Sequence, residues 1–340
     1  MIEEKSLIYS LEGPYSLSLE EKDLDLASIP DGHIFAKTLY SAISTGTELA
    51  AWSGKPPLRP SKVYPRLMGY CNVAQIQSVG REAGDFRKGD IILTHQSHRT
   101  NFICRGQDVL LRFDRLEDED KKKLATSYLF HLGYSALSEG QYRPGAEVAI
   151  VGFGALGYCT ASLVSAYGGF PQIYSGRSST LNSSSIPHAA MHSKNAVWSR
   201  EASPSKLDGA DIVINTSDAW EDYELSLQLV RRGGTIVLLG FPGRGQSAPE
   251  FNPLDSRYIY DKLISIKQAG HVINSDIAPL DVRFNMRRNL AHIFALLRAV
   301  RINASPLLSA KYPWSSLAEA YTMLHAKNNE SLSAILDWTC

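Results

Sequence analysis

The first third of the chain carries short apolar runs separated by turn residues, a pattern typical of β-strands. Apolar residues at helical spacing over 121–138 then predict a helix. This part of the chain is therefore expected to be rich in β-structure, followed by one helix. The strands are expected at 34–39, 72–79, 90–93 and 109–113.

The middle of the chain alternates between strand and helix patterns, as parallel βαβ units do. We expect a doubly wound parallel sheet with helices in a domain of residues 129–271, and one β-rich domain built from residues 1–128 and 272–340. The middle strands are expected at 148–151, 172–175, 211–215, 235–240 and 263–267, with helices at 158–167 and 222–231. Later elements are expected at 284–301 and 317–326 (helices) and 333–338 (strand).

A glycine motif directly follows the predicted strand at 148–151. Gly152, Gly154 and Gly157 have the spacing G-x-G-x-x-G, and an apolar helix pattern follows them. The first glycine permits a tight turn, the second lets a pyrophosphate approach the backbone, and the third lets helix and strand pack closely. The helix N-terminus offers N–H groups to phosphates. The motif therefore predicts a dinucleotide site, with the intervening Phe153, Ala155 and Leu156 among its contacts.

The residues at the end of the next predicted strand indicate which nicotinamide dinucleotide, NAD(H) or NADP(H), is expected. NAD-binding domains place a carboxylate there, about 20 residues beyond the glycines, to bind the ribose 2′-OH. This chain has Ser175, Gly176 and Arg177 and no acid in the loop that follows. Because a guanidinium pairs bidentately with a phosphate, we expect NADP(H). Further cofactor contacts are expected where later strands end, at Asn215, Thr216, Gly240 and Phe241.

Charge and cysteine content argue against several classes of protein. Lys+Arg and Asp+Glu both total 35, so neither a nucleic acid nor an anionic membrane is an expected partner. The first residues lack a secretory pattern, and no apolar run reaches the about 20 residues that span a bilayer. The four cysteines are scattered without a C-x-x-C pair, which argues against a disulfide framework and favours a cytoplasmic location.

Several phrases resemble the medium-chain dehydrogenase/reductase superfamily, and they follow the order of that superfamily over nearly the whole chain. The phrase I-S-T-G-T-E at 43–48 is similar to the bacteriochlorophyllide a dehydrogenase branch. The resemblance implies a GroES-like catalytic domain interrupted by a Rossmann domain, a small-molecule substrate, and a homodimer or homotetramer. The other phrases are Met68-Gly69-Tyr70-Cys71, Lys88-Gly89-Asp90, the glycine motif and Arg232-Gly233-Gly234-Thr235-Ile236-Val237.

The zinc ligands of that superfamily have no counterparts here. Zinc-dependent members carry a cysteine where this chain has Ser44 or Thr45, and a Gly-His-Glu motif where it has Gly69-Tyr70-Cys71. The third ligand corresponds to about Tyr128. A catalytic zinc needs three nitrogen, sulfur or carboxylate ligands, and only Cys71 qualifies. The resemblance therefore implies a zinc-independent member, and we expect no metal site.

Without zinc, another group must handle the proton that accompanies hydride transfer. Thr47 matches the hydroxyl that relays protons in the zinc enzymes, and Thr45 beside it is a candidate cofactor contact. Tyr70 and Tyr128 occupy former ligand positions, where each either acts as an acid or only fills the space that zinc vacated.

Three histidines are the remaining catalytic candidates. His95 and His98 follow the predicted strand at 90–93, and they are either acids of the site or a solvated loop pair. His131 lies about one helical turn past Tyr128, so it either shares the same face or is an ordinary packed histidine. The sequence does not decide among these alternatives.

These features favour an NADP(H)-dependent oxidoreductase that interconverts a secondary alcohol and a ketone on a small or medium-sized organic substrate. The resemblance to alcohol dehydrogenases supports this reaction. The loss of zinc favours reduction of an activated C=C bond instead, because an enolate needs less electrophilic help. A non-catalytic nucleotide-binding protein is the third hypothesis.

The Arg177→Ala variant should weaken the binding of NADPH by about tenfold or more and leave that of NADH nearly unchanged, because only NADPH carries the 2′-phosphate. Fluorescence titration with each cofactor measures the two dissociation constants. Equal losses for both cofactors would remove Arg177 from the cofactor site.

Overall fold

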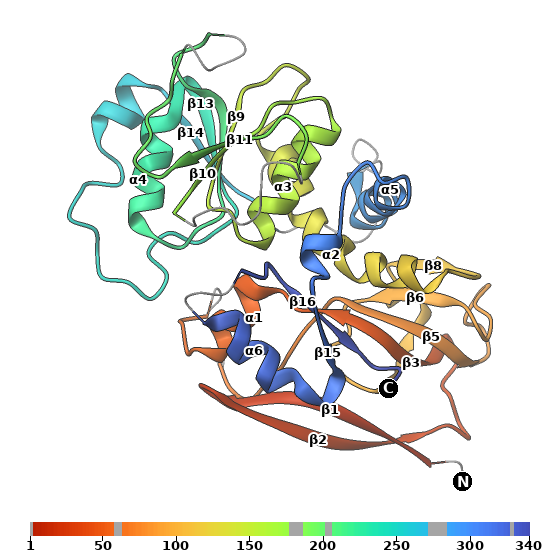
Figure 1. Cartoon of the computed structure of the whole chain (residues 1–340). Coiled ribbons are helices and arrows are strands. Elements are labelled where there is room, and N and C mark those ends of the chain that lie inside the picture. Colours follow the sequence, from red (N-terminus) through yellow and green to blue (C-terminus); the bar gives the residue numbers. More distant parts are fainter. Residues whose placement is uncertain (1–2, 58–62, 177–185, 201–205, 271–283, 327–329) are drawn as a thin grey trace. The chain divides into compact units, whose positions relative to one another are not determined.

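The computed structural model describes residues 3–57, 63–176, 186–200, 206–270, 284–326 and 330–340. The chain divides into two compact units, and each is described by itself (Figure 1). Met1–Tyr128, Ile273–Ala299 and Ala304–Cys340 form the first unit. Leu129–Val272 and Val300–Asn303 form the second. Arg177, the predicted phosphate-binding residue, lies outside the described residues.

A mostly antiparallel sheet forms the body of the first unit. Its strands have the order β15-β16-β3-β5-β6-β8, and β7 pairs with β3. A smaller sheet has the order β2-β1-β4. The strands are β1 (Glu3–Gly13), β2 (Ser16–Asp25), β3 (His33–Ala42), β4 (Arg66–Leu67), β5 (Asn72–Val79), β6 (Ile91–Thr94), β7 (Asn101–Arg105), β8 (Leu111–Phe113), β15 (Ala310–Pro313) and β16 (Ala334–Asp337).

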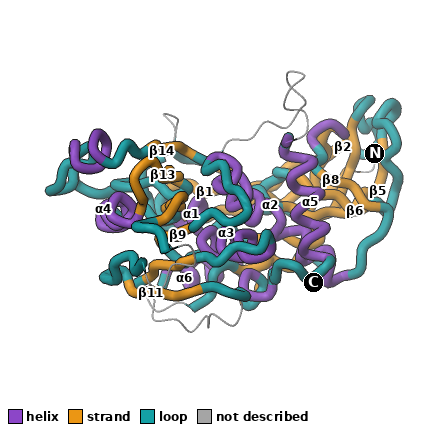
Figure 2. The backbone as a smooth tube through the Cα atoms, turned by 90° about the horizontal axis from the view of Figure 1, so that it is seen from above, coloured by secondary structure: helices purple, strands orange, loops and turns teal. Residues whose placement is uncertain are grey.

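The helices that pack on the first unit come from both ends of the sequence. α5 (Met286–Arg298) packs beside β8, where the rings of Phe113 and Phe294 lie 4.9 Å apart (Figure 2). α1 (Thr45–Trp52) and α6 (Leu317–His325) share an apolar core in which the ring centroids of Trp52 and Tyr321 are 5.5 Å apart. The first unit thus brings helices from opposite ends of the chain onto one core. Short 3₁₀ segments are Gly106–Asp108, Ser305–Leu307 and Trp314–Ser316.

A parallel sheet forms the body of the second unit, with the strand order β11-β10-β9-β12-β13-β14. The order reverses at β9, so α3 and α4 flank opposite faces of the sheet (Figure 1). The elements are α2 (Asp118–Glu139, beginning in the first unit), β9 (Val148–Val151), α3 (Ala155–Ala166), β10 (Gln172–Ser175), β11 (Ala190–Ser193), β12 (Ala210–Asn215), α4 (Trp220–Leu229), β13 (Val230–Leu238), the π-helical turn Arg257–Asp261 and β14 (Ser265–Gln268).

The predicted fold class is confirmed, as are the strands at 72–79, 148–151 and 172–175 with their bounds. The helix expected at 222–231 is wrong at its end, because α4 stops at Leu229 and Val230 begins β13. The ammonium of Lys262 explains this early stop. It donates to the carbonyls of Leu227, Gln228 and Val230, which satisfies acceptors that a helix end leaves unpaired.

The strand pattern missed the long hairpin of β1 and β2. Its ten-residue second strand, β2, carries mostly exposed side chains, and the apolar alternation of Leu17 and Leu19 gives way to charged residues from Glu20 on. Its backbone hydrogen bonds to β1 hold it instead. The eight-residue helix α1 was also unforeseen.

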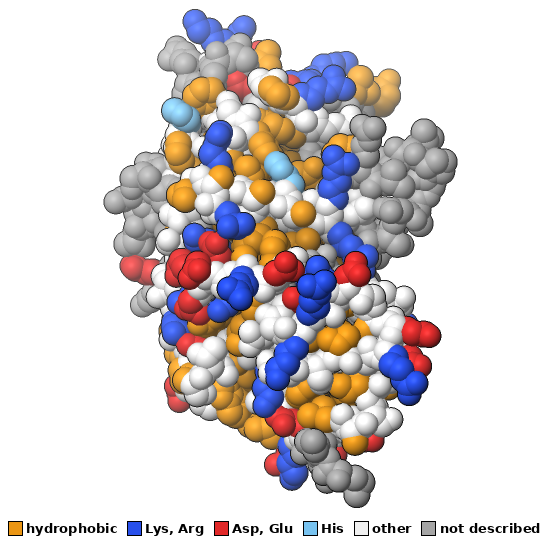
Figure 3. All heavy atoms as spheres, turned by 90° about the vertical axis from the view of Figure 1, so that its right-hand side faces the viewer, with side chains coloured by type: hydrophobic (Ala, Val, Ile, Leu, Met, Phe, Trp, Pro, Cys, Tyr) orange, Lys and Arg blue, Asp and Glu red, His pale blue; other side chains and the backbone are white. Residues whose placement is uncertain are grey.

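Acidic and basic side chains lie interspersed over much of the face shown in Figure 3. The 35 acidic and 35 basic residues are therefore not sorted into a single-sign field on that face. Among the helices of the described residues, none is both long and apolar enough to cross a bilayer.

Candidate active site

The glycine motif lies between β9 and α3, and each glycine has a separate steric role. Gly152 has φ 94°, a conformation that favours glycine. A Cβ on Gly157 would lie 2.2 Å from the carbonyl oxygen of Gly152, so α3 packs directly on the turn. A Cβ on Gly154 would meet nothing within 4 Å. Gly152 and Gly157 are therefore needed for the shape of the turn, whereas the space beside Gly154 is open.

Gly154 is also the N-cap of the twelve-residue helix α3, and no side chain caps that end. The first N–H groups of a helix lack intrahelical partners. Such N–H groups are the donors that bind phosphates at helix N-termini. The local geometry thus suits a pyrophosphate.

Loops after neighbouring strands gather beside this turn. The hydroxyl of Thr216, after β12, donates to the carbonyls of Val151 and Gly152 at 3.1 and 3.2 Å. A Cβ on Gly240, after β13, would lie 2.2 Å from the carbonyl oxygen of Ser217. Predicted cofactor residues of the second unit thus lie at the carboxyl ends of its parallel strands: Ser175 and Asn215 are the last residues of β10 and β12, and Thr216 and Gly240 come shortly after β12 and β13. Thr45 belongs to the first unit, in α1, where its hydroxyl donates to the carbonyl of Leu332.

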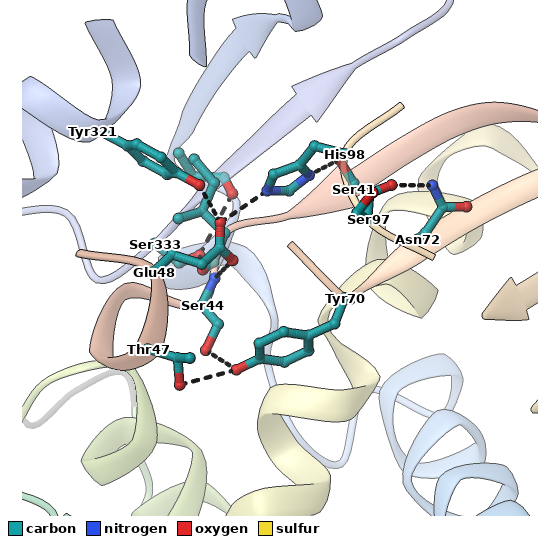
Figure 4. Close-up of polar contacts among 12 residues, drawn as sticks. Ser41, Ser44, Thr47, Glu48, Tyr70, Asn72, Ser97, His98, Tyr321 and Ser333 are labelled. Carbon is teal, nitrogen blue, oxygen red and sulfur yellow. Dashed lines mark hydrogen bonds and ion pairs between the residues drawn. The ribbon is translucent and has the colours of Figure 1, made fainter. Parts of the chain in front are cut away.

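Three hydroxyls meet in the first unit, as Figure 4 shows. The Tyr70 hydroxyl donates to the Ser44 hydroxyl and lies 3.3 Å from the Thr47 hydroxyl oxygen. Ser44 is the N-cap residue of α1, although its side chain makes no capping bond, and Thr47 lies in the first turn of that helix. We call Ser44, Thr47 and Tyr70 the hydroxyl cluster. Sequence reasoning predicted Thr47 and Tyr70 as site residues, but not that Ser44 would be the partner of the phenol.

Two further predicted residues adjoin this cluster. The ring of Tyr128 lies 5.5 Å from that of Tyr70 and 4.7 Å from that of His95, both edge to face. His95 bonds through Nδ1 to the carbonyl of Tyr70 at 3.1 Å, and its Nε2 lies 3.4 Å from the sulfur of Met286. The structure therefore brings four predicted catalytic residues of the first unit together.

Burial keeps the polar groups of this region neutral. It raises the pKa of Tyr70 far above the usual value of a phenol. It also raises the pKa of Tyr128 to about 12, with a smaller contribution from Cys71. Burial lowers the pKa of His95, an effect that the bond to the Tyr70 carbonyl partly offsets. At neutral pH both phenols are protonated and His95 is uncharged, so the phenols act as neutral donors.

The other two histidines lie elsewhere. His98 is fully buried, with Nε2 2.9 Å from Glu48 and Nδ1 2.8 Å from the Ser41 hydroxyl (Figure 4). The indole of Trp338 donates to the same Ser41 oxygen. The solvated-loop alternative is therefore wrong for His98, whose contacts position neighbouring groups. His131 is buried in the second unit, further along α2.

These donors do not fit a catalytic zinc. Zinc favours thiolate, imidazole and carboxylate ligands. Of the matched positions only Cys71 carries such a group, whereas the others carry the Ser44 hydroxyl and two phenols whose pKa values are raised. Within the described residues there is no group of three or more His, Cys, Asp or Glu side chains that could hold a metal ion.

Comparison with known proteins places this fold among dehydrogenases. A zinc-binding dehydrogenase of Sinorhizobium meliloti, solved with NADP, matches with a TM-score of 0.73 and 16% identity over 98% of this chain and 99% of that one. An alcohol dehydrogenase of Escherichia coli, solved with NADH, matches with a TM-score of 0.74 and 14% identity over 98% and 99%. The chain has the fold of the medium-chain alcohol dehydrogenases.

A curated relative agrees with this fold. The 2-desacetyl-2-hydroxyethyl bacteriochlorophyllide A dehydrogenase of Cereibacter sphaeroides is 24% identical over 361 aligned residues, which cover 96% of each protein. The relative and the solved structures support the resemblance to the medium-chain superfamily that the sequence phrases gave. No protein-family model matches the chain.

Two alanine variants of the glycine motif should separate packing from binding. Gly157→Ala places a methyl against the Gly152 carbonyl and should lower the free energy of unfolding by about 1–3 kcal/mol or more. Gly154→Ala meets open space, so its unfolding should be nearly unchanged while dinucleotide affinity falls. Urea unfolding and cofactor titration measure both; an unaltered affinity in Gly154→Ala would contradict the assigned phosphate position.

Proposed function

We propose that this chain is an NADP(H)-dependent oxidoreductase that interconverts a secondary alcohol and a ketone, with a tyrosine hydroxyl in place of a catalytic zinc. The observation that carries the proposal is the hydroxyl cluster, in which the Tyr70 phenol contacts Ser44 and Thr47. By resemblance, Ser44 and Tyr70 stand at or beside positions where zinc enzymes carry ligands. A small or medium-sized organic substrate would bind with its oxygen at this cluster.

NADPH, when bound, supplies the hydride. The residues of the second unit have the task of binding it. The turn at Gly154 and the N-terminus of α3 would hold the pyrophosphate, and the loops after β12 and β13 would contact the rest of the dinucleotide. The preference for NADP(H) over NAD(H) rests on the absence of an acid after β10 and on Arg177.

Tyr70 is suited to donate the proton. Its raised pKa keeps the phenol protonated at neutral and mildly alkaline pH. Hydride addition to a ketone makes an alkoxide, which is a stronger base than a phenolate, so the proton moves from Tyr70 to the substrate oxygen. Water must then supply the proton that restores the Tyr70 phenol, and the Thr47 and Ser44 hydroxyls beside it can relay that proton by accepting one as they donate another. Alcohol oxidation would need an ionised Tyr70, so the raised pKa favours ketone reduction.

Reduction of an activated C=C bond is the second candidate. The donors that replace zinc favour it, because the charge of an enolate is already delocalised and needs less stabilisation from a neutral phenol than the localised charge of an alkoxide. A non-catalytic nucleotide-binding role would be favoured by cofactor binding without turnover on any ketone or enone.

The Tyr70→Phe variant should lower kcat for ketone reduction by about 100-fold or more while leaving the dissociation constant of NADPH within about twofold, because only the proton donor is lost. The wild-type rate should also stay level from pH 6 to about 9, since the raised pKa keeps Tyr70 protonated over that range. Steady-state kinetics on a panel of ketones and enones measures both effects.

Tyr128→Phe is the matched control. It removes a neighbouring phenol that makes ring contacts with Tyr70 and His95, and most turnover should remain. The opposite ranking of the two variants would transfer the role of acid to Tyr128. Full activity in both would contradict a tyrosine acid.

Zinc should be dispensable for activity. Protein grown with added zinc and then desalted should contain well below one zinc per chain by mass spectrometry, because hydroxyls and neutral phenols are poor zinc ligands. Ketone reduction should persist after treatment with a chelator. One zinc per chain that leaves together with the activity would contradict the zinc-independent reaction.

A further inference from the structure

Gly176 and Lys194 directly follow two neighbouring strands of the second unit, at equivalent positions of the strand pairing. β10 and β11 pair in parallel with Ser175 opposite Ser193, so the next residue of each strand is Gly176 and Lys194 respectively. Gly176 thus lies at the carboxyl end of β10, the strand after the glycine motif. In open α/β sheets, the ribose of a dinucleotide binds at that strand end.

The Lys194 side chain lies across Gly176. A Cβ added to Gly176 would be 3.3 Å from Cε and 3.4 Å from Cδ of the lysine, so the methylene stem covers the face of the glycine. The ammonium is thereby brought to the end of β10, where this chain has no acid among the described residues Ser175 and Gly176. Sequence reasoning missed this lysine, because it lies 18 residues beyond Gly176 in the chain and only the strand pairing brings the two together.

A buried carboxylate fixes the ammonium. Lys194 Nζ lies 2.6 and 2.7 Å from the two carboxylate oxygens of Asp222, in the first turn of α4. Asp222 is 2% exposed, whereas the lysine side chain is 38% exposed. An ammonium has three N–H donors, so the carboxylate can engage two of them while one remains for a ligand on the exposed side. The positive end of α4 offsets part of the Asp222 charge.

We propose that Lys194, held in position by Asp222, binds the 2′-phosphate of NADP(H) and is a determinant of the preference for NADP(H) over NAD(H). The proposal rests on the proposed function, since it assumes that the second unit binds a nicotinamide dinucleotide. A phosphate monoester carries close to two negative charges at pH 7. It therefore gains more from the fixed ammonium than an uncharged 2′-hydroxyl does.

The test uses the full chain and two adenosine probes that carry no nicotinamide. Adenosine 2′,5′-bisphosphate has the 2′-phosphate, and 5′-AMP lacks it. Calorimetric titration gives the ratio of their dissociation constants. Because Lys194→Met alone would leave a buried unpaired carboxylate, the main variant is the double one, Lys194→Met with Asp222→Asn.

Wild-type protein should bind the bisphosphate about tenfold or more tightly than 5′-AMP, and the double variant should lose most of this preference. Lys194→Arg, which keeps the charge, should retain much of it. Asp222→Asn alone should retain more of it than the double variant, since it keeps the ammonium. Arg200→Met, which removes a cation from the chain beyond β11, is the control and should leave the ratio unchanged.

A preference that is as large in the double variant as in the wild type would overturn the assignment of Lys194 and leave NADP(H) selection to another cation. A wild-type protein that binds both probes equally would also overturn it, because no selection for a 2′-phosphate would exist. If the wild type binds neither probe, nor NADPH nor NADH, the proposed function itself fails.

Discussion

The hydrogen bonds to the buried carboxylate of Glu48 organise the first unit. It is 2% exposed and accepts hydrogen bonds from the Ser44 backbone, the His98 ring and the Tyr321 hydroxyl, which come from three distant parts of the sequence (Figure 4). Leaving such a charge unpaired costs about 3–5 kcal/mol, so these segments are held where they satisfy it. Glu48 shares the first turns of α1 with Ser44 and Thr47. The same carboxylate therefore fixes the two hydroxyls that the Tyr70 phenol contacts.

The two histidines of the β6–β7 segment illustrate how the same residue type acquires different roles from its surroundings. Trp338 can only donate to the Ser41 oxygen, so the Ser41 hydroxyl is free to donate to Nδ1 of His98. Nε2 of the same ring lies 2.9 Å from Glu48, so both nitrogens of this buried histidine have polar partners. His98 is thus a positioning residue. His95, three residues earlier, contacts the Tyr70 carbonyl and the Tyr128 ring instead.

Strands and glycine turns could be predicted from the sequence, because they depend on neighbouring residues. Contacts between polar or charged residues that lie far apart in the sequence could not. The apolar strands at 148–151 and 172–175, the turn at Gly152 and the close packing at Gly157 follow from patterns within about a dozen residues. The bond between Glu48 and Tyr321 joins residues 273 positions apart, and no local pattern indicates it. The ion pair of Lys194 and Asp222 could not be predicted either. Charged residues are mostly exposed, and only the fold shows that the Asp222 carboxylate is buried.

A phenol in place of metal ligands restricts the substrates that the proposed reaction can use. A metal ion polarises a carbonyl as a Lewis acid, whereas one hydrogen-bond donor to a developing oxyanion is worth about 3–4 kcal/mol. His95 adds no positive charge at neutral pH, because burial lowers its pKa. The substrate must therefore contribute part of the activation itself, through an electron-withdrawing neighbour of the carbonyl or through conjugation. Unactivated alcohols are the least suited substrates, since their oxidation needs a base and the phenols of this region stay protonated.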